Sequence, residues 1–373
     1  MDVAASIRPT ARTRFARIAQ LAVVTVPPNE SGRRSRFVRS RRAVAAGVLL
    51  FVASQVGLNL AIRENVVPVR DPVFTEKNDF LAPHADYHRA VEPTAPLRVM
   101  ALGSSRTQLG FDANRFQSQC ESPVSAFNFG CPAAGPITSA LYFRRLLERG
   151  VHPDVLFVEL HPGFLAKADP PFEARWLHAY RLRPNEIDVL HSYGWDIPPP
   201  PHHGWKGWLA GIHGYRMGLL NRYWPTMLAC PYGLTVGIRS DDRGFVPGIE
   251  FPKHERPRAL QRTHAEYAPV LADYHVGGSG CEAILDTLAL CREKNIRAVA
   301  VLMPESSEFR GWYGAAGYAE ITAFAQSLGV PAYDARTWVK DDDFADGHHL
   351  TARGAAAFTD RLAKDWSEMS KAK

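Results

Sequence analysis

The hydrophobic positions after residue 95 follow two alternating patterns. Five short, continuous apolar runs predict buried strands, at 97–102, 125–129, 155–160, 298–303 and 330–333. Apolar residues that recur at helical spacing predict helices, at 137–149, 281–294, 318–328 and 351–367. Apolar strands that alternate with amphipathic helices predict an α/β fold, in which helices cover both faces of a parallel sheet. Ligands of such sheets bind at the carboxyl ends of the strands, so residues that directly follow a strand are candidates for a site.

A long segment, 162–275, interrupts this alternation and differs in composition. It holds five of the eight tryptophans of the chain: Trp176, Trp195, Trp205, Trp208 and Trp224. We expect helical stretches at 172–182 and 206–228, and therefore one mostly helical insertion at the ligand-binding edge of the sheet, similar to a lid. Its aromatic side chains suit either the core of the insertion or stacking on sugar rings.

Near the N-terminus, residues 43–62 form an apolar run of 20 residues without a formal charge. As a helix this run is about 30 Å long, the thickness of the hydrocarbon core of a membrane. Six arginines lie directly before it, within a leader, 1–42, that carries ten arginines and two acidic residues. The positive-inside rule then predicts a cytoplasmic leader and a single-pass anchor in the cell (inner) membrane. A polar stalk, 63–95, and a folded domain, 96–367, are expected in the periplasm or outside the cell.

Other interpretations of the same segment remain open. It resembles a cleaved signal peptide, but the sequence that closes the run has no small-x-small cleavage site. Ser40-Arg41-Arg42 also matches the short twin-arginine export pattern. A buried helix of a soluble protein is the third alternative, although a polar face at helical spacing is nearly absent. We favour the uncleaved anchor.

Composition changes this picture in two ways. The 373 residues carry a net charge of +6, but the leader alone accounts for +8, so the body is close to neutral. The basic balance is therefore poor evidence for nucleic-acid binding, and no nucleic-acid partner is expected. The five cysteines lack metal-ligand spacing; Cys120 and Cys131 are close enough in sequence for a disulfide in an oxidising compartment, while buried thiols are the simpler expectation.

Candidate chemistry lies at two turns that are far apart in the chain. The first predicted strand runs into Gly103-Ser104-Ser105, where a tight turn before a helix exposes a serine hydroxyl at the sheet edge. Asp346 and His349 directly precede the last helix, and their spacing lets a carboxylate orient an imidazole that takes a proton from a serine. His348-His349 could instead bind a metal, but no cluster with ligand spacing accompanies them, so neither a metal nor another cofactor is expected.

Three motifs together resemble the SGNH/GDSL hydrolase superfamily: Gly103-Ser104-Ser105, an asparagine-containing turn at 128–135, and D-x-x-H-L at 346–350. The resemblance covers about 95–161 and 280–367. It implies a flavodoxin-like, three-layer α/β/α sheet with Ser105 as nucleophile, its own N–H in the oxyanion hole, His349 as general base and Asp346 as orienter.

Two motifs depart from the superfamily pattern around the oxyanion hole. In the second, spacing from Asn128 places the backbone donor at Ala133, whereas residue type favours Gly130 or Gly135. The third normally supplies an asparagine, which is missing here; His161 lies nearby and its imidazole N–H could replace the amide. Losing one oxyanion donor typically costs roughly 10²–10³ in rate, which puts strong hydrolysis in doubt.

The order of anchor, stalk and divergent SGNH domain is similar to membrane proteins of polysaccharide O-acetylation and of D-alanylation. This resemblance implies a serine esterase or O-acyltransferase that acts on acyl esters of a cell-surface or exported polysaccharide. The implied partners are that polysaccharide or an acyl donor, and a membrane-bound acyltransferase. An inactive SGNH scaffold that binds polysaccharide or an assembly partner is the alternative. A nucleotide-binding flavodoxin-like domain is disfavoured, since the chain has no G-x-x-x-x-G-K-[ST] motif.

Overall fold

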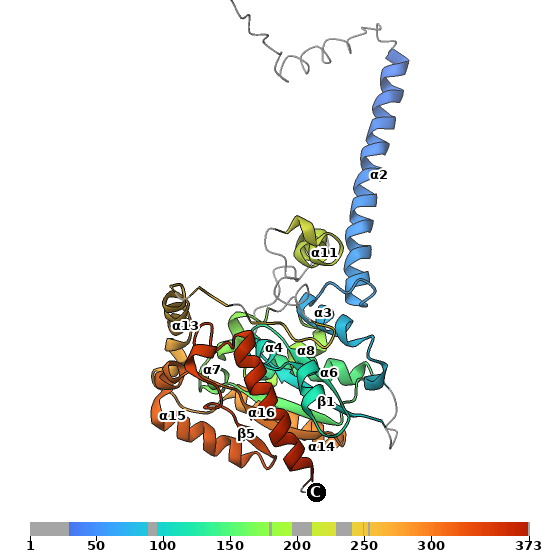
Figure 1. Ribbon diagram of the computed structural model, residues 1–373. Helices are drawn as coiled ribbons and strands as arrows, with labels where there is room; N and C mark the ends of the chain where they lie inside the picture. Colours follow the sequence, from blue (N-terminus) through green and yellow to red (C-terminus); the bar gives the residue numbers. More distant parts are fainter. Residues whose placement is uncertain are drawn as a thin grey trace, which may run out of the picture. The chain divides into compact units, whose positions relative to one another are not determined.

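The computed structural model describes residues 30–88, 95–178, 181–195, 211–228, 241–248, 250–252 and 254–371. The chain divides into two compact units, residues 1–57 and 58–373. The long helix α2, Glu30–Arg63, begins in the first unit (Figure 1). Its stretch Val38–Arg63 is long and apolar enough to cross a membrane, and an 18-residue window within it has a mean hydropathy of 1.9. This confirms the expected apolar helix near the N-terminus, which extends beyond 43–62 on both sides.

The second unit is built on a sheet of five parallel strands. They are β1 Leu97–Gly103, β2 Val124–Gly130, β3 Val155–Leu160, β4 Arg297–Leu302 and β5 Ala332–Asp334. Their spatial order is β2-β1-β3-β4-β5, and every pair is parallel. The order reverses between β1 and β3, so the carboxyl ends of these two strands flank the crevice where sheets of this kind place their ligands.

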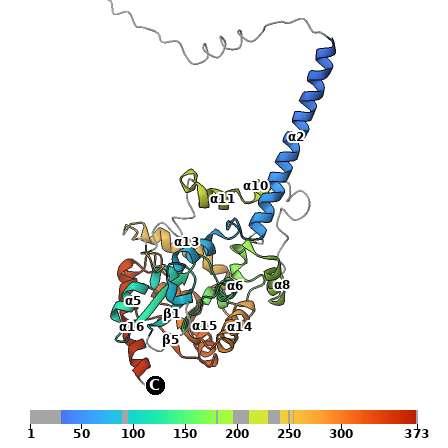
Figure 2. The same cartoon turned by 90° about the vertical axis from the view of Figure 1, so that its right-hand side faces the viewer.

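Successive residues of each strand point to opposite faces of the sheet and pack into two separate hydrophobic cores. On one face, residues such as Met100 and Leu102 pack with α6 (Pro136–Glu148), α14 (Ser279–Glu293) and α15 (Ser307–Ser327). On the other face, residues such as Val99 and Ala101 pack with α5 (Ala113–Gln119) and α16 (Ala352–Lys371). Figure 2 shows these helices on opposite sides of the sheet. The predicted three-layer α/β/α fold is confirmed.

The segment expected to be a stalk, 63–95, instead joins the body. It contains α3, Pro72–Leu81, which begins at the capping residue Asp71. Val73, Phe74 and Leu81 of this helix are buried in the same core as α6. Farther along, the Tyr87 hydroxyl donates to the carbonyl of Val99 in β1, at 2.7 Å. Proline and polar residues suggested an extended linker, but the apolar side of this short helix adds to the core.

The inserted segment 162–275 is mostly helical where it is described. Its elements are α7 Pro162–Leu165, η3 Phe172–Arg175, α8 Pro184–Ser192, α10 Gly211–Gly214, α11 Arg216–Tyr223, η5 Pro225–Met227 and α13 Arg256–Leu271. The expected helices 172–182 and 206–228 are thus shorter and broken, and α13 was not predicted. Trp195 is buried, which fits a core role, whereas Trp224 is exposed. Trp205 and Trp208 lie outside the described residues.

The cysteines of the described part are free thiols. Cys120 and Cys131 form no disulfide, and Cys131, Cys281 and Cys291 are buried. Burial raises the pKa of Cys131 to about 12, so it stays a neutral thiol near pH 7. These residues therefore act as small hydrophobic side chains, and Cys230 lies outside the described residues.

One buried lysine of α3 should make the stability of the fold depend on pH. Lys77 donates to the carbonyls of Asn128 and Gly244, and burial lowers its pKa to about 8 from an ordinary value of 10.5. Between these two pH values the folded chain releases a proton that the unfolded chain keeps, so this group's contribution to stability rises with pH. We expect the Tm of the wild type, relative to Lys77→Met, to increase from pH 8 to 10.5 in thermal unfolding. The exposed Lys364→Met on α16 is the matched control, and a constant difference for Lys77→Met would contradict the prediction.

Candidate active site

Ser105 lies at the turn that joins β1 to the short helix α4, Ser105–Gly110. The strand ends at Gly103, where a Cβ would come within 2.3 Å of both Glu159 and Thr107, so only glycine allows this close approach. Ser104 is the N-cap, and its hydroxyl accepts from the N–H of Arg106 at 3.1 Å. The turn thereby presents Ser105, which is half-buried, at the carboxyl edge of the sheet.

Asp346 and His349 lie on the loop between β5 and α16. Gly347 between them has a φ of 96°, a left-handed conformation that favours glycine, and its other side faces Leu260 of α13. The Asp346 carboxylate contacts His349 Nδ1 at 2.8 Å and also accepts from the backbone N–H of His349 at 2.9 Å. The imidazole is therefore held in one orientation by its own loop.

The structure brings this loop to Ser105, 244 residues away in sequence. Ser105 Oγ lies 2.8 Å from His349 Nε2. Since Asp346 faces Nδ1, the ring carries its proton there and leaves Nε2 as acceptor for the serine hydroxyl. Although burial opposes it, His349 and His348 hold the pKa of Asp346 well below its usual range, so the carboxylate is charged. This arrangement can take a proton from the serine hydroxyl and stabilise the resulting imidazolium.

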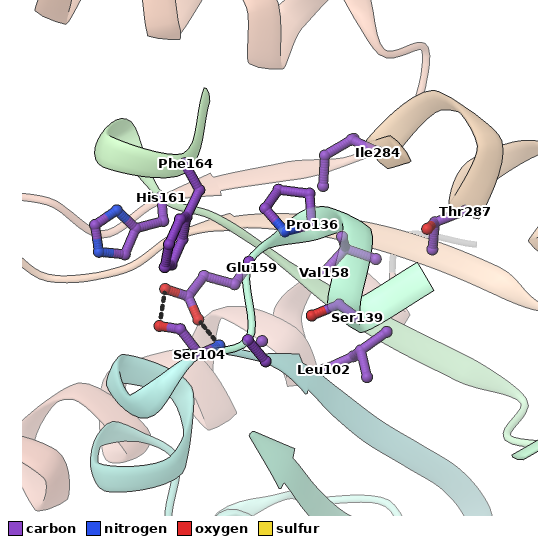
Figure 3. A pocket seen from close by; sticks show the side chains of 13 residues that line it. Leu102, Ser104, Pro136, Ser139, Val158, Glu159, His161, Phe164, Ile284 and Thr287 are labelled. Atoms are coloured by element: carbon purple, nitrogen blue, oxygen red, sulfur yellow. Dashed lines mark hydrogen bonds between the residues drawn. The ribbon is translucent and has the colours of Figure 1, made fainter. Parts of the chain in front are cut away.

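Glu159, at the carboxyl end of β3, holds the serine turn and was not identified from the sequence. Its carboxylate accepts from the Ser104 N–H at 2.6 Å and from the Ser104 hydroxyl at 2.8 Å (Figure 3). It also accepts from the Thr107 hydroxyl at 2.7 Å, which reaches it from the first turn of α4. A single acidic residue inside the apolar run VLFVEL was the available signal, because a buried carboxylate requires several donors.

We therefore expect Glu159→Gln to disturb the serine turn. A carboxamide has one oxygen in place of two, so either its NH₂ group faces the Ser104 N–H or the Ser104 hydroxyl has to turn from donor to acceptor. If Ser105 is the nucleophile, its displacement should lower kcat about 10²-fold with little change in KM. Steady-state kinetics on an acyl ester test this, with Glu293→Gln, an exposed residue of α14, as control. An unchanged kcat would contradict the positioning role.

The three residues expected to donate to an oxyanion all have partners in the structure. The N–H of Gly130 donates to the Asn128 side chain at 2.8 Å. The Glu173 carboxylate accepts from the backbone N–H of Gly135, and also from the N–H groups of Ile137 and Thr138 at the start of α6. His161 accepts the N–H of Gly163 on Nδ1 at 3.0 Å, and its Nε2 faces the Tyr267 hydroxyl at 3.3 Å.

Two backbone features nearby still suit an oxyanion. Ala133, the position selected by spacing from Asn128, has a φ of 57°, which marks a sharp turn there. Ser105 itself is the first residue of α4, where N–H groups have no acceptor within the helix. Burial lowers the pKa of His161 well below its usual range, so the ring is neutral and its Nε2–H is a donor. The oxyanion hole stays a prediction.

His348 adds a possible metal-binding group beside the same loop. Asp346, His348 and His349 each offer a ligand atom, and these atoms lie within 4.8 Å of one another. Burial lowers the pKa of His348 to about 4, so its ring is neutral at physiological pH, the form that binds metals. However, Asp346 and His349 already bond each other, so a metal at this position would have to replace the contact that orients His349.

Arg106 and Arg310, two arginines that could attract an anionic substrate, are bonded within the protein. Arg106 is fully buried and donates to the carbonyls of Met303 and Pro304, which ties α4 to the end of β4. Arg310 donates to the carbonyl of Arg336 at 2.8 Å. An exposed guanidinium is found instead at Arg175, centred 4.4 Å above the ring of Phe172 in the inserted segment.

A small, mostly apolar cavity lies behind the serine turn, on the side covered by α6 and α14 (Figure 3). Strand residues Leu102 and Val158 and helix residues Pro136 and Ile284 line it, together with Ser104, Glu159 and His161. Ser105 is not among the lining residues. The cavity therefore adjoins Gly103 and Ser104 of the turn, and not the contact between Ser105 and His349.

Comparisons with known proteins add little to this geometry. No family model matches the chain, and no curated protein matches its sequence. One solved structure that it resembles belongs to a protein of Bacteroides fragilis NCTC 9343 described as a "putative acylhydrolase", with 10% sequence identity and a TM-score of 0.37. The match covers 78% of this chain and 95% of that one.

Proposed function

We propose that this chain is a serine enzyme that cleaves or transfers acyl esters, with Ser105, His349 and Asp346 as its catalytic residues. The observation that carries the proposal is the continuous line of contacts from Ser105 Oγ to His349 Nε2, 2.8 Å, and from His349 Nδ1 to Asp346, 2.8 Å. Both distances suit direct proton transfer and orientation in a nucleophile–base–carboxylate arrangement. His349 keeps about a fifth of its side-chain surface exposed, so a substrate can reach the pair.

In the first half of the reaction, Ser105 Oγ attacks the acyl carbon while its proton passes to His349 Nε2. Asp346 stabilises the imidazolium, and the carbonyl oxygen becomes an oxyanion. The bond to the leaving alcohol then breaks, and that oxygen takes the proton from His349, which leaves an acyl-serine. In the second half, water or a sugar hydroxyl gives its proton to His349 and attacks the acyl carbon. Ser105 regains its proton as the free acid or the new ester departs.

We also propose a specific class of substrate, namely acyl esters on a cell-surface or exported polysaccharide. It rests on the resemblance to SGNH proteins of polysaccharide modification and on the helix Val38–Arg63, which is long and apolar enough for an anchor. An arginine-rich leader before that helix favours a cytoplasmic N-terminus and a periplasmic or extracellular body. The proposed partner is a membrane-bound acyltransferase, which would pass acyl groups to this protein or take them from it.

A second candidate, a non-catalytic SGNH scaffold that binds polysaccharide, is favoured by one observation. Gly130, Gly135 and His161, the expected oxyanion groups, all have partners within the protein. Ser105 and His349 could lie in contact in a site that does not stabilise the oxyanion, and such a site would not cleave an acyl ester at a useful rate.

Covalent labelling separates these candidates. The full chain in detergent is incubated with a fluorophosphonate probe and mapped by peptide mass spectrometry, alongside turnover of an aryl acetate. We expect the label on Ser105, and none on Ser104, whose hydroxyl is bonded to Glu159. Absence of both labelling and turnover would favour the scaffold. Turnover that a chelator abolishes and Zn²⁺ restores would favour a metal at Asp346, His348 and His349 and contradict the serine mechanism.

A further inference from the structure

One stretch of the body, residues 212–227, exposes an unusual number of large apolar side chains. Outside α2, the described residues contain nine large hydrophobic side chains that are exposed, and five of them lie in this stretch: Ile212, Met217, Tyr223, Trp224 and Met227. Trp224 is 56% exposed and Met227 is 71% exposed. We call these five residues the 212–227 surface. Isolated exposed hydrophobic residues are ordinary, but a cluster of this kind marks an interaction site.

The polar and small residues of α11 face the helix α3 of the same unit. A Cβ on Gly218 would lie 2.3 Å from the carbonyl oxygen of Val69, so the two backbones are in close contact. Asn221 and Arg222 bond the carboxylates of Glu76 and Asp79 on α3. These contacts fix α11 on α3 through its polar residues, which leaves the apolar side chains to face outward.

The chain path places this surface close to the end of the apolar helix. That helix ends at Arg63, and Val69 follows six residues later, a reach of roughly 20 Å at full extension. The chain is not extended there, since Asn65 has a φ of 58° and the N–H groups of Val66 and Val67 both donate to the carbonyl of Ala61. Because Val69 touches Gly218, α11 lies within that short distance of the point where the helix ends.

We propose that the 212–227 surface docks on the lipid bilayer, at the side where the apolar helix leaves it. Tyr223 and Trp224 are the residue types that favour the headgroup level of membranes, and Ile212, Met217 and Met227 can enter the boundary of the acyl chains. The exposed Arg216 lies in the same stretch and suits the phosphates of anionic lipids. The proposal depends on α2 spanning the membrane and is independent of the serine chemistry.

Docking would also determine how the active site is presented. α3 carries α11 on one side, and on another its Lys77 donates to the carbonyl of Asn128 near the end of β2. The carboxyl edge of the sheet, where Ser105 lies, is thus connected to the 212–227 surface through one short helix. A docked body holds this edge at a constant height above the lipid instead of moving about a flexible stalk.

Fluorescence quenching in nanodiscs tests the docking. The full chain is placed in phosphatidylcholine and phosphatidylglycerol discs with and without brominated acyl chains, which quench only nearby indoles. The apolar run 43–62 contains no tryptophan, so the signal comes from the body. We expect the quenched fraction to fall about twofold in Trp224→Phe, because its indole lies at the lipid interface. Trp338→Phe, a half-buried tryptophan before α16, is the matched control and should not lower that fraction.

A second variant keeps the reporter and weakens the surface. Met217→Gln with Met227→Gln retains Trp224 but removes exposed apolar area, so quenching of Trp224 should also decrease while the Tm in detergent stays the same. Equal quenching in the wild type and Trp224→Phe would overturn the docking proposal. A chain that fails to enter the discs would overturn the membrane span on which it rests, and would leave the serine mechanism unaffected.

Discussion

Replacing Ser105 by alanine should abolish acyl-ester turnover, with a loss of at least about 10³-fold in kcat, because the nucleophile is removed. His349→Ala should cause a loss of similar size, since the serine then has no base at Nε2. The double variant should be no worse than either single one, because residues that act as a unit in one step are not additive. The measurement is kcat and KM for an aryl acetate, with full chain in detergent.

The controls for this prediction are available in the same chain. Ser105 has one described side-chain partner, His349, so alanine there should leave the Tm nearly unchanged. Ser118→Ala on α5 and His275→Ala are exposed replacements of the same types and should retain full activity. Residual rates for Ser105→Ala and His349→Ala equal to that of the wild type would rule out the proposed mechanism.

The second large effect concerns stability. Replacing Arg145 of α6 by methionine should lower the free energy of unfolding by about 3–5 kcal/mol, because it leaves buried carboxylates without their partner. Arg145 donates twice to Glu186, at 2.7 Å each, and to Asp71 at 2.8 Å, and all three side chains are buried. Those two carboxylates raise the pKa of Arg145 even though burial opposes them, so the guanidinium is always charged.

Denaturant unfolding of the full chain in detergent measures this loss. Arg361→Met is the matched control: Arg361 also lies over an aromatic ring, Trp338, but its pair with Asp365 is exposed, so the change should be below about 1 kcal/mol. Adding Glu186→Gln to Arg145→Met should recover part of the loss, since one unpaired buried charge is removed. A loss no larger than that of Arg361→Met would show that the network is not needed.

This network also shows why the segment after the apolar helix belongs to the body. Asp71 precedes α3, Arg145 lies on α6, and Glu186 lies on α8 of the inserted segment. One guanidinium thus joins three parts of the chain that the sequence assigned to a stalk, the core and an insertion. The sequence contained each charge but offered no local pattern that pairs residues 71, 145 and 186.

The strands and the central helices were predictable because their signals are local. β3 matches its expected range, and β1, β2 and β4 differ from theirs by one residue at one or both ends. Continuous apolar runs bounded by glycine or polar residues indicate strands that are buried on both faces. The helix α13 was missed because it buries only four residues, Ala259, Thr263, Tyr267 and Leu271, and some of these are polar.

The residues of the candidate site also divide into those with a local sequence signal and those without one. Turn chemistry singled out Ser105, Asp346 and His349, since a serine after a strand and a D-x-x-H loop are patterns within a few residues. Glu159 was missed because its role depends on Ser104 and Thr107, which reach it across neighbouring strands. The partners of Gly135 and His161 could not be predicted either, because Glu173 and Tyr267 come from the inserted segment.

By itself, the sequence determined the α/β class and the apolar N-terminal helix, and it singled out Ser105, His349 and Asp346 as candidates, because periodicity, length and turn composition act over short stretches. Only the tertiary structure decided that Ser105 and His349, 244 residues apart, lie 2.8 Å from each other. It also decided that residues 72–81 are part of the core and that residues 212–227 face outward beside them. These outcomes depend on which surfaces are buried together, and that is settled by the packing of the whole chain.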